Sequence, residues 1–197
     1  MPLLTYQEKS LFFIHIPKTG GASLYLANLQ HQGVSTEFIN TSTCFPCTPQ
    51  HYHIELLERY HPEYKNQGAF TILRNPWARL CSEYVWQKKD SNFTEFENWI
   101  DVALGCYASD PYILDNHIRP QYHFINDYVK VFLHEDYDQA EQYVNKYFNN
   151  EFDFSEKQHV NQYIKPSLTS MPTSIQNKFK DFYKQDIEIY EKHSNSR

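Results

Sequence analysis

A short turn near the start of the chain, residues 17–21 (PKTGG), holds the first residues that could do chemistry. It follows a bounded apolar run, Leu11–Ile16, which is typical of a buried strand, and it precedes a segment with helical spacing. A helix N-terminus presents unpaired N–H groups and partial positive charge, and glycines let the main chain approach an anion closely. Lys18 adds a full charge, and Thr19 and Ser23 add hydroxyl donors. A glycine pair alone would suit an ordinary strand-to-helix turn, but this combination predicts a phosphate site.

The order of residues in this turn differs from the two common phosphate loops. In a Walker A loop the lysine follows the last glycine, whereas Lys18 precedes both glycines, and the dinucleotide pattern G-x-G-x-x-G is absent. The stretch HIPKTGGASL instead resembles the 5′-phosphosulfate loop of sulfotransferases that use 3′-phosphoadenosine 5′-phosphosulfate (PAPS). It is most similar to the carbohydrate group that contains the heparan sulfate 2-O- and 6-O-sulfotransferases and their bacterial-type members. That group usually has a threonine where this chain has Ala22. The resemblance implies that the cofactor is bound by Lys18, Thr19, Gly20, Gly21, Ala22 and Ser23.

A second motif, residues 70–84 (FTILRNPWARLCSEY), combines a predicted strand end with a helix start. Arg74 ends the strand, and Ser82 lies about two turns into the helix, so both side chains could reach one phosphate. Taken singly, Arg74 could serve a structural ion pair and Ser82 could be a small packing residue. Together they resemble the 3′-phosphate motif of the same sulfotransferases, R-[DN]-P-x-x-R-x-x-S-x-Y. The resemblance implies that Arg74 and Ser82 bind the 3′-phosphate of PAPS.

The segment between the two motifs carries two histidines, His51 and His53. A hydroxyl is a poor nucleophile unless a base removes its proton, and histidine suits that task near neutral pH. In the resembling group a histidine opens a segment of the form H-x-x-x-x-x-L and acts as the base. His51 fits that register, with Leu57 at its end, and His53 is the alternative. Lys18 is then expected to be catalytic as well, by neutralising charge on the bridging oxygen as its bond to sulfur breaks.

Two further segments extend the resemblance. Residues 115–121 (DNHIRPQ) are similar to a segment common in bacterial members, and residues 159–161 (HVN) resemble a late segment near the nucleotide pocket. We expect Arg119 and Gln121 to bind the substrate, although a basic residue here could equally be a surface charge.

The pair Cys44 and Cys47 has the spacing C-x-x-C, and His51 and His53 follow closely, so a zinc site is one interpretation. No second pair of cysteines accompanies it. We favour free cysteines in a reducing compartment. The chemistry implied by the resemblance requires no metal.

Strands alternate with helices along the chain, which predicts an α/β fold with a mainly parallel central sheet flanked by helices. The resemblance implies the P-loop-like sulfotransferase fold, and we expect residues 1–197 to form a single sulfotransferase domain. Ligands bind at the carboxyl ends of such strands, where both motifs would lie. The predicted strands are Leu11–Ile16, Val34–Ile39, Ala69–Leu73 and Tyr128–Leu133. The predicted helices are Ile54–Tyr60, Trp77–Lys88, Phe93–Leu104, Asp138–Phe148 and Ser174–His193.

The composition fits a globular protein, with 41% hydrophobic residues in a chain of 197. A net charge of −6 argues against a general nucleic-acid binder. No stretch approaches the ~20 apolar residues of a membrane helix, and no apolar leader is present at the N-terminus, so we expect a soluble, cytoplasmic protein. It would be a bacterial-type protein or a piece trimmed from a membrane-anchored precursor.

The sequence thus predicts a PAPS-dependent sulfotransferase that moves a sulfuryl group to a hydroxyl of a carbohydrate or glycan acceptor. A P-loop-like nucleotide kinase is one alternative, because residues 129–136 (VKVFLHED) place acidic residues after a strand, where magnesium could bind. A nucleotide- or glycan-binding module without catalysis is another. The acceptor and the oligomeric state are not encoded in any motif that we identify.

Overall fold

The computed structural model of the protein describes residues 2–21, 32–38, 46–88, 95–154 and 166–195. Five strands form one sheet in the order β3-β1-β2-β4-β5. Their bounds are β1 (Leu3–Tyr6), β2 (Lys9–Phe13), β3 (Ser35–Glu37), β4 (Ala69–Leu73) and β5 (Val129–Leu133). The helices are α2 (Ile54–Tyr60), α3 (Tyr64–Gln67), α4 (Pro76–Lys88), α5 (Phe96–Tyr107), α6 (Tyr137–Phe148), α7 (Thr173–Phe182) and α8 (Lys184–Ser194).

The sheet is parallel across β2, β4 and β5 and antiparallel at the edge formed by β1 and β3. β4 lies between β2 and β5 and runs parallel to both, with Ala69 opposite Phe12 on one side and Val129 on the other. β1 is antiparallel to both β2 and β3. The expected parallel sheet is therefore confirmed for β2, β4 and β5, while the sheet as a whole is mixed. The N-terminal hairpin of β1 and β2 was not predicted.

The first predicted strand, Leu11–Ile16, is shifted in the structure. β2 begins at Lys9, because Lys9 pairs with Tyr6 of β1, and it ends at Phe13. The chain nevertheless stays beside β4 for one more residue, since the N–H of Ile14 donates to the carbonyl of Phe70 at 2.8 Å. β3 lies inside the predicted strand Val34–Ile39, whose last residue is outside the described part of the chain.

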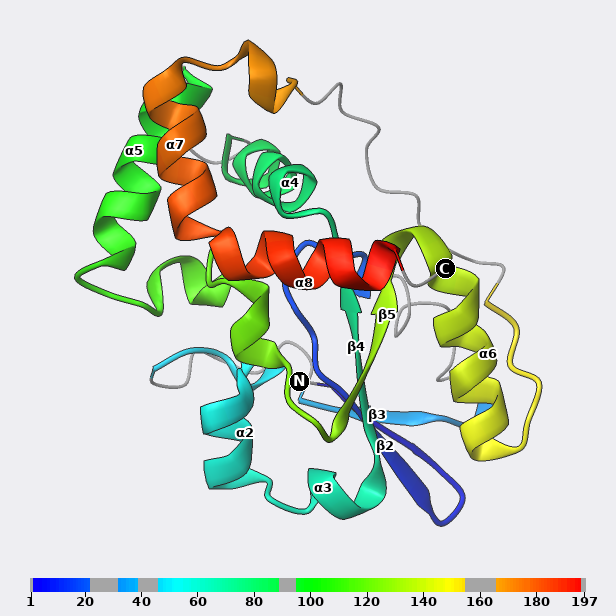
Figure 1. Cartoon of the computed structure of the whole chain (residues 1–197). Coiled ribbons are helices and arrows are strands. Elements are labelled where there is room, and N and C mark those ends of the chain that lie inside the picture. Colours follow the sequence, from blue (N-terminus) through cyan, green and yellow to red (C-terminus); the bar gives the residue numbers. More distant parts are fainter. Residues whose placement is uncertain (1, 22–31, 39–45, 89–94, 155–165, 196–197) are drawn as a thin grey trace.

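The prediction of one C-terminal helix, Ser174–His193, was wrong. The helix breaks at Tyr183 (φ −101°, ψ 21°), and α7 and α8 point in different directions (Figure 1). The break lets the buried Tyr183 hydroxyl donate to the carbonyl of Ile118 at 2.8 Å. It also brings the buried carboxylate of Asp186 to the N–H groups of Gln121 and Tyr122. These tertiary hydrogen bonds outweigh the helical periodicity, which runs through the break.

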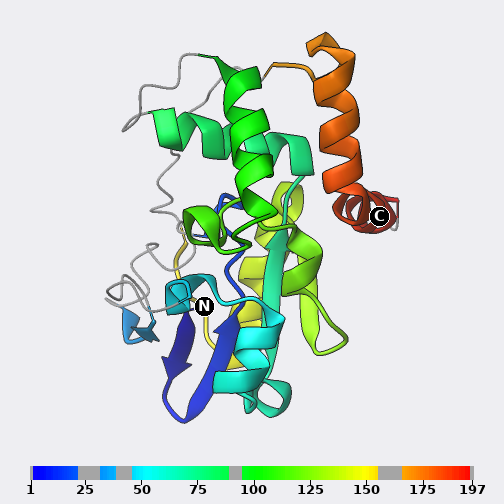
Figure 2. The same ribbon diagram turned by 90° about the vertical axis from the view of Figure 1, so that its left-hand side faces the viewer.

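Two apolar clusters cover the two faces of the sheet. Alternate strand residues point to opposite faces, so Phe70 and Ile72 pack with α6, whereas Ala69 and Leu73 pack with α2 and α3. A third cluster joins α4, α5, α7 and α8 around the buried Trp99. Figures 1 and 2 show that α4, α5 and α7 gather beyond the carboxyl ends of β4 and β5. Loops that leave the parallel strands therefore run between the sheet and this helical layer.

Across the described residues, no helix combines the length and apolar character that crossing a membrane requires.

Candidate functional site

The turn after β2 is held by a hydrogen bond from Thr19 and by close packing. Thr19 is fully buried, and its hydroxyl donates to the carbonyl of Ile16 at 2.8 Å. Lys18 and Gly20 both have left-handed backbones, with φ of 68° and 85°. A Cβ on Gly21 would lie 2.4 Å from Cδ2 of His15, so glycine is required there by contact with a buried side chain. The predicted contacts Ala22 and Ser23 lie outside the described residues.

Arg74 joins the second motif to this turn. Its Nη1 donates to the carbonyl of Lys18 at 2.8 Å, and the side chain is half-buried. Gln121 holds the main chain of Arg74 from both sides, because its Oε1 accepts from the Arg74 N–H and its Nε2 donates to the Arg74 carbonyl. Ser82 lies at a half-buried position of α4. Arg74 thus brings a second cation to the turn that carries Lys18, as an anionic ligand would require.

Arg79 connects the turn to a distant segment. It is 2% exposed, and its guanidinium donates to three main-chain carbonyls, those of Pro17, His117 and Arg119, at 2.9, 2.7 and 2.9 Å. The same buried cation therefore fixes the turn that carries Lys18 and the segment 117–119. The second motif therefore contributes Arg79, which fixes the structure, as well as the candidate phosphate ligand Arg74.

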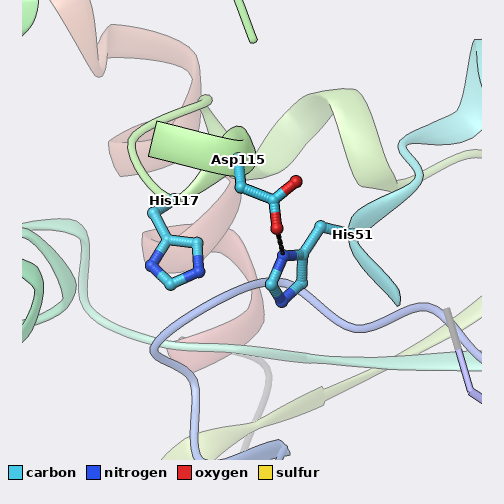
Figure 3. A group of neighbouring side chains, drawn as sticks. All are labelled: His51, Asp115 and His117. Atoms are coloured by element: carbon cyan, nitrogen blue, oxygen red, sulfur yellow. Dashed lines mark hydrogen bonds and ion pairs between the residues drawn. The ribbon is translucent and has the colours of Figure 1, made fainter. Parts of the chain in front are cut away.

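His51 lies at the centre of the site and is hydrogen-bonded to Asp115 (Figure 3). Its Nδ1 is 2.7 Å from Oδ2 of Asp115. Thr48 donates to the same carboxylate from its N–H and its hydroxyl, both at 2.7 Å. Burial acts to raise the pKa of Asp115, but the hydrogen bonds from His51 and Thr48 outweigh it and lower this pKa to about 2. Because an ionised carboxylate only accepts, Nδ1 of His51 carries the proton and Nε2 keeps its lone pair.

The proton affinity of His51 is low in the folded protein. The side chain is buried, and burial lowers its pKa to about 4, although the hydrogen bond to Asp115 acts in the opposite direction. His51 is therefore neutral at pH 7, in the form that can accept a proton.

The segment that carries Asp115 has an unusual backbone. Leu114, Asp115 and Asn116 all have left-handed φ, at 54°, 53° and 65°. Such residues cost of order 1 kcal/mol each and persist only where their surroundings determine them. The buried Asn116 donates to the carbonyl of His51 at 2.9 Å and accepts from Nε of Arg119 at 2.7 Å. These contacts fix the strained segment so that Asp115 reaches His51.

A second histidine–carboxylate pair lies beside the first. Nδ1 of His117 is 2.7 Å from Oε2 of Glu83, which is fully buried. Burial acts to raise the pKa of Glu83, but the hydrogen bonds from His117 and Gln87 outweigh it and the net shift is downward. The rings of His51 and His117 lie edge to face with centroids 4.9 Å apart. His15 completes the group, with its ring 5.2 Å from that of His51 and its Nδ1 bonded to Gln50.

His53, the alternative base, is placed differently. It precedes α2, is 1% exposed, and packs against the rings of Tyr112, His123 and Phe124. Burial lowers its pKa to about 4. Its Nδ1 is buried with no hydrogen-bond partner among the residues that the structure describes. Its Nε2 lies 3.5 Å from Oε2 of the exposed Glu55 at the start of α2.

Arg119 and Gln121 are both buried, at 4% and 1% exposed, and contact the protein's own chain. Besides Asn116, Arg119 donates to the carbonyl of Pro111 and lies over the ring of Tyr112. Through these contacts Arg119 and Gln121 position other parts of the protein. That they bind the substrate stays a prediction. Sequence reasoning missed Asp115, His117 and Glu83 as functional candidates, although all three lie inside the segments that were singled out.

Only one residue of the cysteine pair lies in the described part of the chain, so the zinc interpretation of this pair stays untested. Cys47 is buried, with Sγ accepting from Asn116 Nδ2 at 3.2 Å, and Cys44 lies outside the described residues. Residues 159–161 are also outside them.

A comparison with protein families matches almost the whole chain. The chain matches the model described as "Sulfotransferase family" over residues 2–193. No curated protein and no solved structure matches the chain. The match includes every motif discussed above and both histidine–carboxylate pairs, and the chain therefore belongs to the sulfotransferase family.

Proposed function

We propose that this sulfotransferase uses PAPS and transfers the sulfuryl group to a carbohydrate hydroxyl, with His51 as the base. The observation that carries the proposal is the hydrogen bond from His51 Nδ1 to Asp115, because it leaves Nε2 as the proton acceptor. The base stands beside a turn whose charge and shape suit an anion. Sulfuryl transfer to a neutral hydroxyl benefits from such a base beside the site of the anionic donor.

The turn fits a polyanionic nucleotide in its donor chemistry. Lys18 and Arg74 are both cationic, and the Arg74 guanidinium donates to the main-chain carbonyl of Lys18; Gly20 is half-buried with a backbone that favours glycine. PAPS, when bound, supplies the sulfuryl group together with the phosphate oxygen that leaves. We assign Lys18 to that oxygen, and Arg74 with Ser82 to the 3′-phosphate, within a P-loop-like arrangement. Of the other predicted cofactor contacts, Thr19 and Gly21 shape the turn through their contacts with Ile16 and His15.

The proton of the acceptor hydroxyl passes to Nε2 of His51 as the oxygen attacks. The imidazolium that forms carries protons on both nitrogens, and Asp115 stabilises it through the bond already present at Nδ1. Thr48 keeps the Asp115 carboxylate ionised and oriented. The reaction needs no movement of these three residues, which the left-handed segment around Asp115 holds in place.

The carbohydrate acceptor rests on the resemblance of HIPKTGGASL and of residues 70–84 to the heparan sulfate 2-O- and 6-O-group. The test is to incubate the protein with ³⁵S-labelled PAPS and a panel of glycans, phenols and steroids. We expect the label to be transferred to glycans alone, and we expect this transfer to be lost in the variant His51→Ala. Transfer only to phenols or steroids would overturn the acceptor class, and magnesium-dependent phosphoryl transfer from ATP would overturn the reaction.

A further inference from the structure

Three ligand-type side chains converge at the site: His51, Asp115 and His117. One ligand atom of each lies within 4.8 Å of the others, and Figure 3 shows the three groups turned toward one another. We propose that this group binds a transition-metal ion of the Zn²⁺ class, and that the bound ion switches off the base. The proposed inhibition by the ion rests on the proposed function of His51 as the base. The proposed binding of the ion does not depend on that function.

The donor set suits such an ion. Two imidazoles and one carboxylate are a common set for zinc, and three protein ligands leave a fourth position for water. Asp115 and Glu83 supply two negative charges, which balance those of a divalent ion. The three ligands come from two places in the sequence, residue 51 and residues 115–117, and the fold brings them together.

The surrounding contacts already orient the ligands. Glu83 is bonded to Nδ1 of His117, so Nε2 of that ring is the nitrogen turned toward His51 and Asp115 (Figure 3). A carboxylate on the far nitrogen of a histidine ligand is the usual supporting contact at zinc sites. Thr48 plays the same part for Asp115, with two hydrogen bonds to its oxygens.

For His51 and Asp115, binding would require only a small change in geometry, whereas the ligand atom of His117, within 4.8 Å of the other two, moves closer to them. Nδ1 of His51 and Oδ2 of Asp115 are 2.7 Å apart, joined by one proton. Two ligands of a tetrahedral zinc ion, each about 2.0–2.1 Å from it, lie about 3.3 Å apart. An ion replaces the shared proton if the two side chains separate by a fraction of an ångström.

The consequence for the base follows from proton balance on the ring. A neutral imidazole carries one proton, which without metal is on Nδ1. A metal on Nδ1 displaces that proton, and the ring takes one up on Nε2 through solvent. The number of protons on the ring is unchanged, but Nε2 now donates and can no longer accept from a hydroxyl. The ion thereby blocks the reaction without occupying the turn around Lys18.

Binding is tested by titrating the chain with Zn²⁺ calorimetrically, and with Co²⁺ followed by visible absorption. Cys106→Ser serves as the background, because Cys106 is an exposed free thiol that could bind these ions itself. We expect one site, weakened 10-fold or more in His117→Ala and Asp115→Asn and weakened measurably in Glu83→Gln. His61→Ala, which removes a histidine paired with Glu63 outside the group, is the matched control and should bind normally. Equal affinity in His117→Ala and the background would overturn the site, provided that circular dichroism shows both folded.

The tautomer switch is tested separately by ¹⁵N NMR of the histidine rings. His51 should show a protonated Nδ1 without metal and a protonated Nε2 with Zn²⁺. Turnover should fall as the site fills, recover with EDTA, and leave the affinity for adenosine 3′,5′-bisphosphate (PAP) unchanged. Zinc that binds without changing the His51 tautomer would overturn the switch. If no acceptor is ever sulfated, the proposed function fails while the calorimetric and NMR results still decide the metal site.

Discussion

The guanidinium of Arg74 donates a hydrogen bond to the main-chain carbonyl of Lys18 at 2.8 Å, across 56 residues of sequence. Each residue belongs to a different predicted cofactor motif. The bond forms because β2 and β4 are parallel neighbours, so the loops that follow them leave the same edge of the sheet. Arg74 is thus both a candidate phosphate ligand and a support for the turn.

Arg74→Ala should weaken the binding of PAP by roughly 1.5–3 kcal/mol, the scale of a hydrogen bond to a charged group. Arg74→Lys should recover part of this loss, because it keeps the charge but not the two-pronged contact. Isothermal titration with PAP measures both. Arg59→Ala, which removes an exposed arginine on α2, is the control. Unchanged affinity in Arg74→Ala would assign the 3′-phosphate to another residue.

Lys18→Ala should lower kcat more than it weakens PAP binding. PAP lacks the sulfuryl group whose departure Lys18 assists, so the lysine contributes mainly in the transition state. In the structure its Nζ lies 4.4 Å from the centre of the exposed Trp86 ring, so it stands at the surface of the site. Steady-state kinetics and PAP titration separate the two effects. A variant that loses PAP binding but keeps kcat would contradict this role.

His51→Ala should reduce turnover by about 10²–10⁴-fold, the usual size of a general-base contribution, with PAP affinity nearly unchanged. Asp115→Asn should also reduce kcat, because an amide does not hold the Nδ1 tautomer as a carboxylate does. His53→Ala should have the smaller effect, since that ring packs against Tyr112 and Phe124. The three variants are compared with one acceptor. Loss of activity in His53→Ala alone would make His53 the base.

Stability should fall as the pH is lowered from about 6.5 to 4. His51 and His53 each have a folded pKa of about 4, below the unfolded value of 6.5. Between these values the unfolded chain binds protons that the folded chain excludes, which costs up to about 1.4 kcal/mol per pH unit for each histidine. Urea unfolding at pH 7 and pH 5 measures the slope. His53→Phe should flatten it, because phenylalanine does not titrate and the His53 Nδ1 has no hydrogen-bond partner in the described structure. An equally steep slope in that variant would show that His53 is not neutral in the fold.

PAP and PAPS should raise the melting temperature, because a ligand that binds the folded state stabilises it. ATP with magnesium should raise it less, since it lacks the 3′-phosphate assigned to Arg74 and Ser82. Differential scanning fluorimetry at matched ligand concentrations tests the difference. Equal stabilisation by ATP and PAP would remove the support for the second motif as a 3′-phosphate site.

The sequence by itself determined the parts of this protein that depend on local pattern. Ala69–Leu73 and Ile54–Tyr60 have in the structure the bounds that periodicity predicted, because apolar spacing over a few residues decides which face is buried. The two cofactor motifs and their order along the chain also predicted the sulfotransferase family, which the family comparison confirms. The strand β1 was missed because its short run, Leu3–Tyr6, has only one fully buried residue and gains its partners from β2 and β3.

Only the tertiary structure decided which polar side chains are paired. His51 meets Asp115 across 64 residues, and Glu83 meets His117 across 34. No spacing rule predicts such pairs, because they depend on how the strained segment at Asp115 and the helix α4 approach the loop before α2. The buried guanidinium of Arg79 fixes that approach by bonding carbonyls of two distant segments. A buried polar group must find a partner wherever the folded chain brings one, and that position is set by the packing of whole elements rather than by neighbouring residues.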